Sequence, residues 1–309
     1  MKKPELLVTP KRVEDLIPLM SAGADALVVG EQRYGLRLAG EFSREDVKKA
    51  VEIAHEQGKK VYVAMNALFH NDKVPELEGY IRFLKGINAD AIIFGDPAVL
   101  MAARQAAPDM KLHWNTETTA TNWYTCNYWG RKGAARAVLA REINMDAIIE
   151  IKENAEVEIE VQVHGMTAMF QSKRSLLGNY YEYQGKAMEV ENRKQEKNMF
   201  LHDKERENKY PIFEDENGTH IMSPNDICII DELQEMMEAG VDSFKIEGVL
   251  KSPEYIIEVT KIYRKAIDAF AEDPDQYDEI KVDLLAEIEK IQPSNRPLDT
   301  GFFFKETVY

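Results

Sequence analysis

Residues 43–66, SREDVKKAVEIAHEQGKKVYVAMN, contain the unit from which most of the chain is built. Ser43 is suited to the N-cap of a helix, because its side-chain oxygen can accept a hydrogen bond from a backbone N–H of the first turn. Gly58 is the residue type that commonly ends a helix, since it adopts a left-handed backbone without strain. The following run, residues 59–66, predicts a buried β-strand. A helix followed at once by a buried strand is typical of α/β proteins with a parallel sheet.

The same alternation continues in both directions along the sequence. Eight segments read as strands, and each precedes a helical pattern: residues 5–10, 25–30, 59–66, 91–96, 111–117, 136–142, 157–165 and 242–248. Eight such units in about 250 residues predict a closed (β/α)8 barrel of the TIM type. An open doubly wound sheet is the alternative, but no G-x-G-x-x-G motif follows the first strand.

The alternation is interrupted between residues 166 and 222, a segment too long for an ordinary loop. It includes the mixed-charge run NRKQEKNMFLHDKERENKY. We expect an insertion after the seventh strand, either a solvated, partly mobile segment or a lid and partner-docking element over the barrel mouth. A helix is expected at 224–240, and residues 271–309 are expected to extend a single barrel domain that spans 1–309.

Composition excludes several classes of protein. The 309 residues are 44% hydrophobic, enough for one large core. No apolar stretch reaches the roughly 18 residues of a membrane span, and no apolar run follows the N-terminal lysines, so we expect neither a membrane partner nor a signal peptide. Cys126 and Cys228 are too few for a disulfide framework and indicate a reducing cytoplasm. The net charge of −15 disfavours DNA, and RNA contact would need a basic patch or a partner.

Polar residues collect at the predicted C-terminal ends of the strands, where barrel proteins build their sites. They are Asn66, Asp96, Asn115, Glu117, Arg141, Glu142, His164, Lys245 and Glu247. We expect a catalytic group of His164, Lys245 and Glu247. We expect substrate binding by a second group, Asn66, Asp96, Asn115 and Arg141.

Each of these residues also has a purely structural interpretation. His164 could hydrogen-bond only to neighbouring backbone, and Asp96 could cap the helix that follows it. Lys245 and Glu247 could form an ion pair that only holds the barrel mouth together. Cys228 is expected to be buried on a helix face. The sequence contains no zinc signature, no G-x-S-x-G and no P-loop, so it predicts no metal site and no activated nucleophile.

Several motifs together resemble the peptidase U32 family, also described as collagenase-like proteases. They are PELLVTP, AGADALVVG, YGLRLAGEFSREDVKKAVEIAHEQGKKVYVAMN, DAIIFGDPAVL, TNWYTCNYWGRKG, VLAREI, VHG, AGVDSFKIEG, KSPEYIIEVTKIYRKAID and NRPLDTGFFF. The resemblance covers nearly the whole chain and implies a barrel-type domain. It also implies two classes of function. The family name implies a peptidase, whereas other members are accessory proteins for hydroxylation, either of the tRNA wobble uridine, with prephenate, or of ubiquinone.

The resemblance further implies an iron–sulfur cluster held by four cysteines, the first two in an H-G-x-x-C-x(6)-C loop. Here that loop begins at His164, and the cysteine positions hold Ala168 and Ser175. Cys228 matches a later family cysteine, and Val249 stands where the family has an arginine after K-I-E-G. Because one thiolate cannot hold a [4Fe–4S] cluster, we expect this chain alone to bind no such cofactor.

Three hypotheses follow from the resemblance. The first is an accessory subunit of prephenate-dependent tRNA wobble-uridine 5-hydroxylation, which acts with a cluster-bearing paralogue and contacts tRNA through that complex. The second is a U32 peptidase with His164 and Glu247 in its site. The third is a non-catalytic scaffold for the paralogue.

Overall fold

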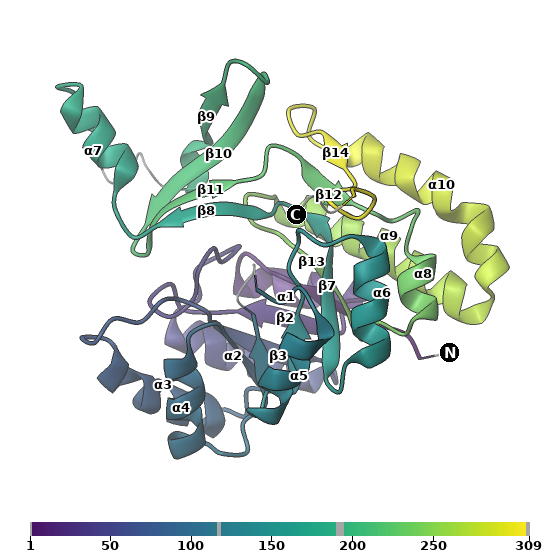
Figure 1. Ribbon diagram of the computed structural model, residues 1–309, viewed down its shortest axis with the longest axis horizontal. Helices are drawn as coiled ribbons and strands as arrows, with labels where there is room; N and C mark the ends of the chain where they lie inside the picture. Colours follow the sequence, from purple (N-terminus) through teal and green to yellow (C-terminus); the bar gives the residue numbers. More distant parts are fainter. Residues whose placement is uncertain (1, 116–118, 190–194, 307–309) are drawn as a thin grey trace.

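The computed structural model describes residues 2–115, 119–189 and 195–306. Eight parallel strands form a barrel in its lower half (Figure 1). They are β1 (Glu5–Val8), β2 (Ala26–Val29), β3 (Lys60–Met65), β4 (Ala91–Phe94), β5 (Leu112–Trp114), β6 (Arg136–Val138), β7 (Glu158–Gly165) and β13 (Ser243–Ile246). Strand β13 pairs with both β7 and β1, which closes the sheet on itself. The predicted (β/α)8 barrel is confirmed.

Helices surround the barrel strands. They are η1 (Val13–Asp15), α1 (Leu16–Ser21), α2 (Arg44–Glu56), α3 (Val74–Gly86), α4 (Pro97–Ala106), α5 (Trp123–Arg131), α6 (Met145–Asn154), α8 (Gln234–Glu238) and α9 (Pro253–Glu272). Helix α2 begins as the sequence predicts, because the Ser43 side chain accepts a hydrogen bond from the backbone of Asp46. The described helices include none long and apolar enough to cross a membrane.

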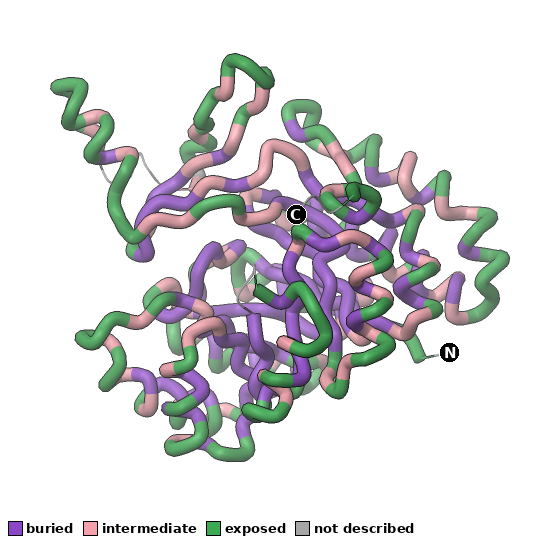
Figure 2. The backbone as a smooth tube through the Cα atoms, in the orientation of Figure 1, coloured by how far each residue is buried: buried purple, intermediate pink, exposed green. Residues whose placement is uncertain are grey.

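The inside of the barrel is packed with side chains. Figure 2 shows its strands as buried throughout most of their length. One apolar cluster fills the space between the strands: Leu7, Ala26, Val28, Tyr62, Ala64, Ala91 and Ile93. The N-terminal end of the barrel holds a buried ion cluster, in which Arg136 lies 2.8 Å from Glu5 and 3.3 Å from Glu160. A ligand site in this barrel therefore has to lie at the opposite end, the mouth.

The inserted segment forms its own four-stranded antiparallel sheet with the order β8-β11-β10-β9. Its elements are β8 (Ala168–Ser172), α7 (Leu176–Tyr183), η3 (Gln195–Lys197), β9 (Met199–Asp203), β10 (Asn208–Asp215) and β11 (Gly218–Met222). Figure 1 places this sheet across the barrel mouth, with α7 and the β9–β10 hairpin projecting outward. In its described part, the segment thus forms regular secondary structure, while the side chains of β8 and β9 are all at least partly exposed.

A small apolar cluster joins the inserted sheet to the barrel mouth. It consists of Ala39, Met166, Phe213, Met222 and Val249. Val249, where the family resemblance implies an arginine, is almost fully buried in this cluster. The apolar side chain at this position therefore holds the inserted sheet against the barrel.

The prediction of a helix at 224–240 is wrong for the first half of this range. Residues Asp226–Cys228 form strand β12, which pairs antiparallel with the end of β7, and only Gln234–Glu238 are helical. This tertiary pairing overrides the local helical pattern, so Cys228 is buried in a strand rather than on a helix. After α9, the chain forms α10 (Pro274–Ile291), which packs against α9, and β14 (Leu298–Asp299), which pairs with β12.

Candidate functional site

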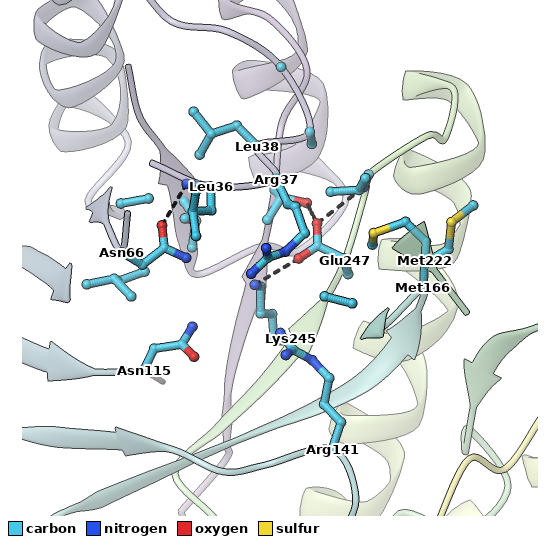
Figure 3. Close-up of a pocket in the computed structure, with 18 residues that line it drawn as sticks. Leu36, Arg37, Leu38, Asn66, Asn115, Arg141, Met166, Met222, Lys245 and Glu247 are labelled. Atoms are coloured by element: carbon cyan, nitrogen blue, oxygen red, sulfur yellow. Dashed lines mark hydrogen bonds and ion pairs between the residues drawn. The ribbon is translucent and has the colours of Figure 1, made fainter. Parts of the chain in front are cut away.

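A cavity of about 40 Å³ lies at the barrel mouth, beneath the inserted sheet (Figure 3). Its polar lining residues are Thr9, Arg37, Asn66, Asn115, Arg141, Lys245 and Glu247. Five of the seven predicted site residues are therefore brought together, from β3, β5, β6 and β13 or the segments that follow these strands. A space of this size has room for roughly two or three water-sized groups, which suits a carboxylate.

Glu247 is the most firmly held group in this cavity. Its carboxylate accepts a hydrogen bond from the Thr9 hydroxyl at 3.0 Å and one from the Val249 backbone N–H at 3.2 Å. The Lys245 ammonium lies 2.9 Å from the other carboxylate oxygen. Both side chains of the ion pair are about 9% exposed. Lys245 and Glu247 therefore form the ion pair that the structural interpretation predicts, and this pair is also one wall of the cavity.

Two glycines allow the backbone around Glu247 to pack this closely. Gly165 has φ +99°, and a Cβ added there would lie 2.3 Å from the carbonyl oxygen of Glu247. At Gly248, a Cβ would lie 2.6 Å from the carbonyl oxygen of Thr9. Glycine at the second position of the H-G motif is thus explained by packing, because a side chain at this position would prevent β7 from approaching the end of β13.

Two arginines line the cavity on either side of Lys245 (Figure 3). The guanidinium of Arg141 donates to the side chain of Gln162 at 2.6 Å, which fixes its direction. Arg37 lies in the loop after β2 with φ +49°, a backbone region that non-glycine residues rarely adopt. We did not predict Arg37 as a site residue, although an arginine between glycines after a strand end, in YGLRLAG, was a usable signal.

The charged groups of the cavity favour an anion. Arg37, Arg141 and Lys245 face a single carboxylate, that of Glu247, among the lining residues that the structure describes. Guanidinium groups bind carboxylates through paired hydrogen bonds, and the amides of Asn66 and Asn115 can orient the same ligand. The described part of the lining contains no cysteine, serine or histidine, and the hydroxyl of Thr9 within it donates to Glu247. The arrangement can bind and orient an anion, but it does not contain an activated nucleophile.

His164 lies outside this cavity, contrary to our expectation. Its Nε2 atom lies 2.7 Å from the Tyr255 hydroxyl in α9, and its ring packs against Tyr263. Burial lowers the pKa of His164 to about 3, so the imidazole is neutral. The cause of its direction is a register shift, since β7 advances from Gln162 to His164 while β13 advances by one residue. The extra residue turns the imidazole away from the mouth.

Asp96 also lies outside the cavity. Its carboxylate accepts a hydrogen bond from the Ala98 backbone at 2.9 Å, as an N-cap of α4, and another from the Phe69 backbone at 3.1 Å. Asp96 therefore caps helix α4, as its structural interpretation predicts. Glu117, which was also considered, lies outside the described residues.

The positions at which the family resemblance implies iron–sulfur ligands lie at three places in the described structure. Ala168 lies on the cavity wall and has no donor atom, and Ser175 lies at the start of α7. Cys228 is buried in β12, and burial raises the pKa of its thiol to about 11. Among the side chains that the structure describes, no group of three His, Cys, Asp or Glu residues is placed to hold a metal ion.

The chain belongs to peptidase family U32, whose family model matches residues 11–308. It is 74% identical over 309 residues to tRNA hydroxylation protein P2 of Bacillus subtilis, covering 100% of both chains. It is 35% identical to tRNA hydroxylation protein P1 of the same organism, covering 98% of this chain and 71% of that one. The solved structure of the U32 peptidase Mk0906 has a TM-score of 0.52 at 15% identity, covering 80% of this chain and 94% of that one, which supports the fold.

Proposed function

We propose that this chain is an accessory subunit of a tRNA hydroxylation system that forms 5-hydroxyuridine at the wobble position. The observation that carries the proposal is the 74% identity to tRNA hydroxylation protein P2 over the full length of both chains. At this identity, the residues that line the mouth cavity are expected to be shared in type and position.

The cavity supports a role in binding an organic anion. Arg37, Arg141 and Lys245 give it an excess of positive charge. Prephenate, which carries two carboxylates, is the co-substrate that fits this charge best among those implied by the family resemblance. We propose that one of its carboxylates is held by these cations.

A cluster-bearing paralogue is the partner that the chain needs in this proposal. Ala168 and Ser175 stand where the family resemblance implies cysteine ligands, and the thiol of Cys228 is buried. The relatives P1 and P2 occur in one organism, so two related chains are available to form a pair there. We propose that the paralogue supplies the redox centre, and that tRNA is contacted through the complex of the two chains.

The decisive experiment is nucleoside mass spectrometry of bulk tRNA from cells that lack this gene. Cells complemented with the wild-type chain should contain 5-hydroxyuridine and its derivatives, whereas cells with an empty vector should lack them. A Lys245→Ala variant should fail to restore the modification, provided that it accumulates to the wild-type level. Unchanged tRNA in the deletion strain would reject the proposed function.

The partner is tested by co-purification of the tagged chain with its paralogue. We expect colourless protein when the chain is purified alone under anaerobic conditions, and absorbance near 400 nm only when the paralogue is present. Stoichiometric iron in the chain alone would reject this part of the proposal. We do not propose peptidase activity, because the described cavity offers no activated nucleophile and both cysteines are buried.

A further inference from the structure

A second hollow of about 260 Å³ continues from the mouth cavity towards the surface, between the barrel rim and β8. We call it the rim cleft. Its lining residues are Leu36, Arg37, Asn66, Leu68, Gly95, Asn115, Ala168, Met169, Phe170 and Gln171. Five of these also line the mouth cavity, so the two spaces are connected: Leu36, Arg37, Asn66, Asn115 and Ala168.

One wall of the rim cleft is apolar and open to solvent. Leu68, Met169 and Phe170 are 59%, 56% and 48% exposed. Exposed apolar side chains that gather around one opening mark a ligand-binding surface. The aromatic ring of Phe170 is the planar group in this wall, and it can stack on another planar group.

A β-bulge brings the neighbouring residues Met169 and Phe170 to the same opening. In the β8–β11 pair, Phe170 lies opposite Ile221 and Ala168 lies opposite Met222, so Met169 is an extra residue. Without the bulge, adjacent residues would point to opposite faces of the sheet. Bulges are frequent beside functional sites, where they redirect a side chain.

The polar wall of the cleft carries two amides. Asn66 and Asn115 directly follow β3 and β5, and Gly95, between them, lets their backbones approach. The Oδ1 atom of Asn66 accepts a hydrogen bond from the Leu36 backbone at 2.9 Å. This fixes the amide so that its NH₂ group is the end turned towards the cavity (Figure 3).

The charge of the rim cleft differs from that of the whole chain. The net charge is −15, but among the residues that the structure describes the cleft lining includes one charged side chain, the cationic Arg37. Lys173 adds a second cation at the rim, where its ammonium lies 3.4 Å from the Leu68 carbonyl oxygen. An anionic strand can therefore approach this opening although the chain as a whole repels polyanions.

We propose that the rim cleft receives one unpaired pyrimidine nucleotide of an RNA loop. The base stacks on Phe170, its hydrogen-bonding edge faces the amides of Asn66 and Asn115, and its phosphate lies near Lys173 at the rim. Uracil presents two carbonyl oxygens on either side of an N–H group, and the NH₂ group of Asn66 can donate a hydrogen bond to one of these oxygens. Single-stranded RNA is generally recognised in this way, by stacking on aromatic side chains and by reading of the base edge. This inference rests on the proposed function and places the substrate base at the same site.

The test measures binding of a fluorescent anticodon stem–loop RNA to the full chain in complex with its paralogue. The probe carries an unmodified uridine at the wobble position, and a second probe is abasic there. Phe170→Ala should weaken binding of the uridine probe by at least about tenfold and leave the abasic probe unchanged. Phe170→Tyr should retain affinity. Phe200→Ala is the matched control, because Phe200 is 38% exposed on β9 of the same sheet and should have no effect.

Three results would overturn the inference: no binding of either probe, equal affinities of the two probes for the wild type, or equal losses for Phe170→Ala and Phe200→Ala. Loss of the paralogue in the Phe170→Ala variant would instead identify the wall as a protein-docking surface, which also rejects it. The tRNA assay separates this failure from failure of the proposed function. If the deletion strain lacks 5-hydroxyuridine and Phe170→Ala restores it fully, only the nucleotide site is rejected.

Discussion

Replacing Gly165 with alanine is expected to destabilise the chain more than a backbone preference alone would explain. Gly165 has φ +99°, and a left-handed backbone costs an L-residue about 1–2 kcal/mol. The new Cβ would also lie 2.3 Å from the carbonyl oxygen of Glu247, so β7 or the end of β13 has to move. Steric overpacking of this kind costs about 1–3 kcal/mol. We therefore expect Gly165→Ala to lower the free energy of unfolding by about 3 kcal/mol.

Gly58→Ala is the control that separates the two contributions. Gly58 has φ +67°, but a Cβ added there would have no neighbour within 4 Å. Its replacement should cost only the backbone part, about 1 kcal/mol. Urea denaturation monitored by circular dichroism measures both losses under one set of conditions. Equal losses for the two variants would show that the contact between Gly165 and Glu247 does not constrain the barrel mouth.

Three further predictions concern groups at or near the mouth. Lys245→Met should lower the free energy of unfolding by about 3 kcal/mol, because it removes the cation that lies 2.9 Å from the buried Glu247 carboxylate. Adding Glu247→Gln should restore most of this loss in urea denaturation. Because the pKa of His164 is about 3 when folded against 6.5 as its ordinary value, stability should fall as the pH drops from 6.5 to 5, by up to ~1.4 kcal/mol per pH unit. His164→Gln should reduce the slope of stability against pH by the contribution of one proton. An unchanged slope would contradict a neutral His164 in the folded chain. Val249→Arg should place a charge in the cluster beneath the inserted sheet, so limited proteolysis should cleave residues 199–222 faster than in Val249→Ile.

The barrel could be predicted from the sequence because each strand and helix carries its own local signal. Ser43 caps its helix as expected, and Asp96 lies where a helix-capping residue would. The strand ends also placed Asn66, Asn115, Lys245 and Glu247 correctly around one cavity. These inferences succeeded because the ends of parallel strands converge in a barrel whatever the details of side-chain packing.

The remaining features depend on contacts between distant segments. The register shift that turns His164 away from the mouth arises from pairing between β7 and β13, which no local pattern reveals. Strand β12 forms because residues Asp226–Cys228 pair with β7, although the local sequence reads as a helix. Arg37 enters the cavity through a left-handed backbone in a loop, a conformation that the residue type does not predict.

The closure of the barrel has a consequence for the order in which the chain is completed on the ribosome. Glu5 of β1 pairs with Ser243 of β13, so the two edges of the sheet cannot join until almost four-fifths of the sequence has been synthesised. The inserted sheet needs only residues between Ala168 and Met222, and its strands β9, β10 and β11 pair antiparallel through short connections. A nascent chain can therefore complete the cover of the mouth before the barrel beneath it exists. During that interval the exposed edges of β1 and β7 are the part of the molecule most in need of protection from aggregation.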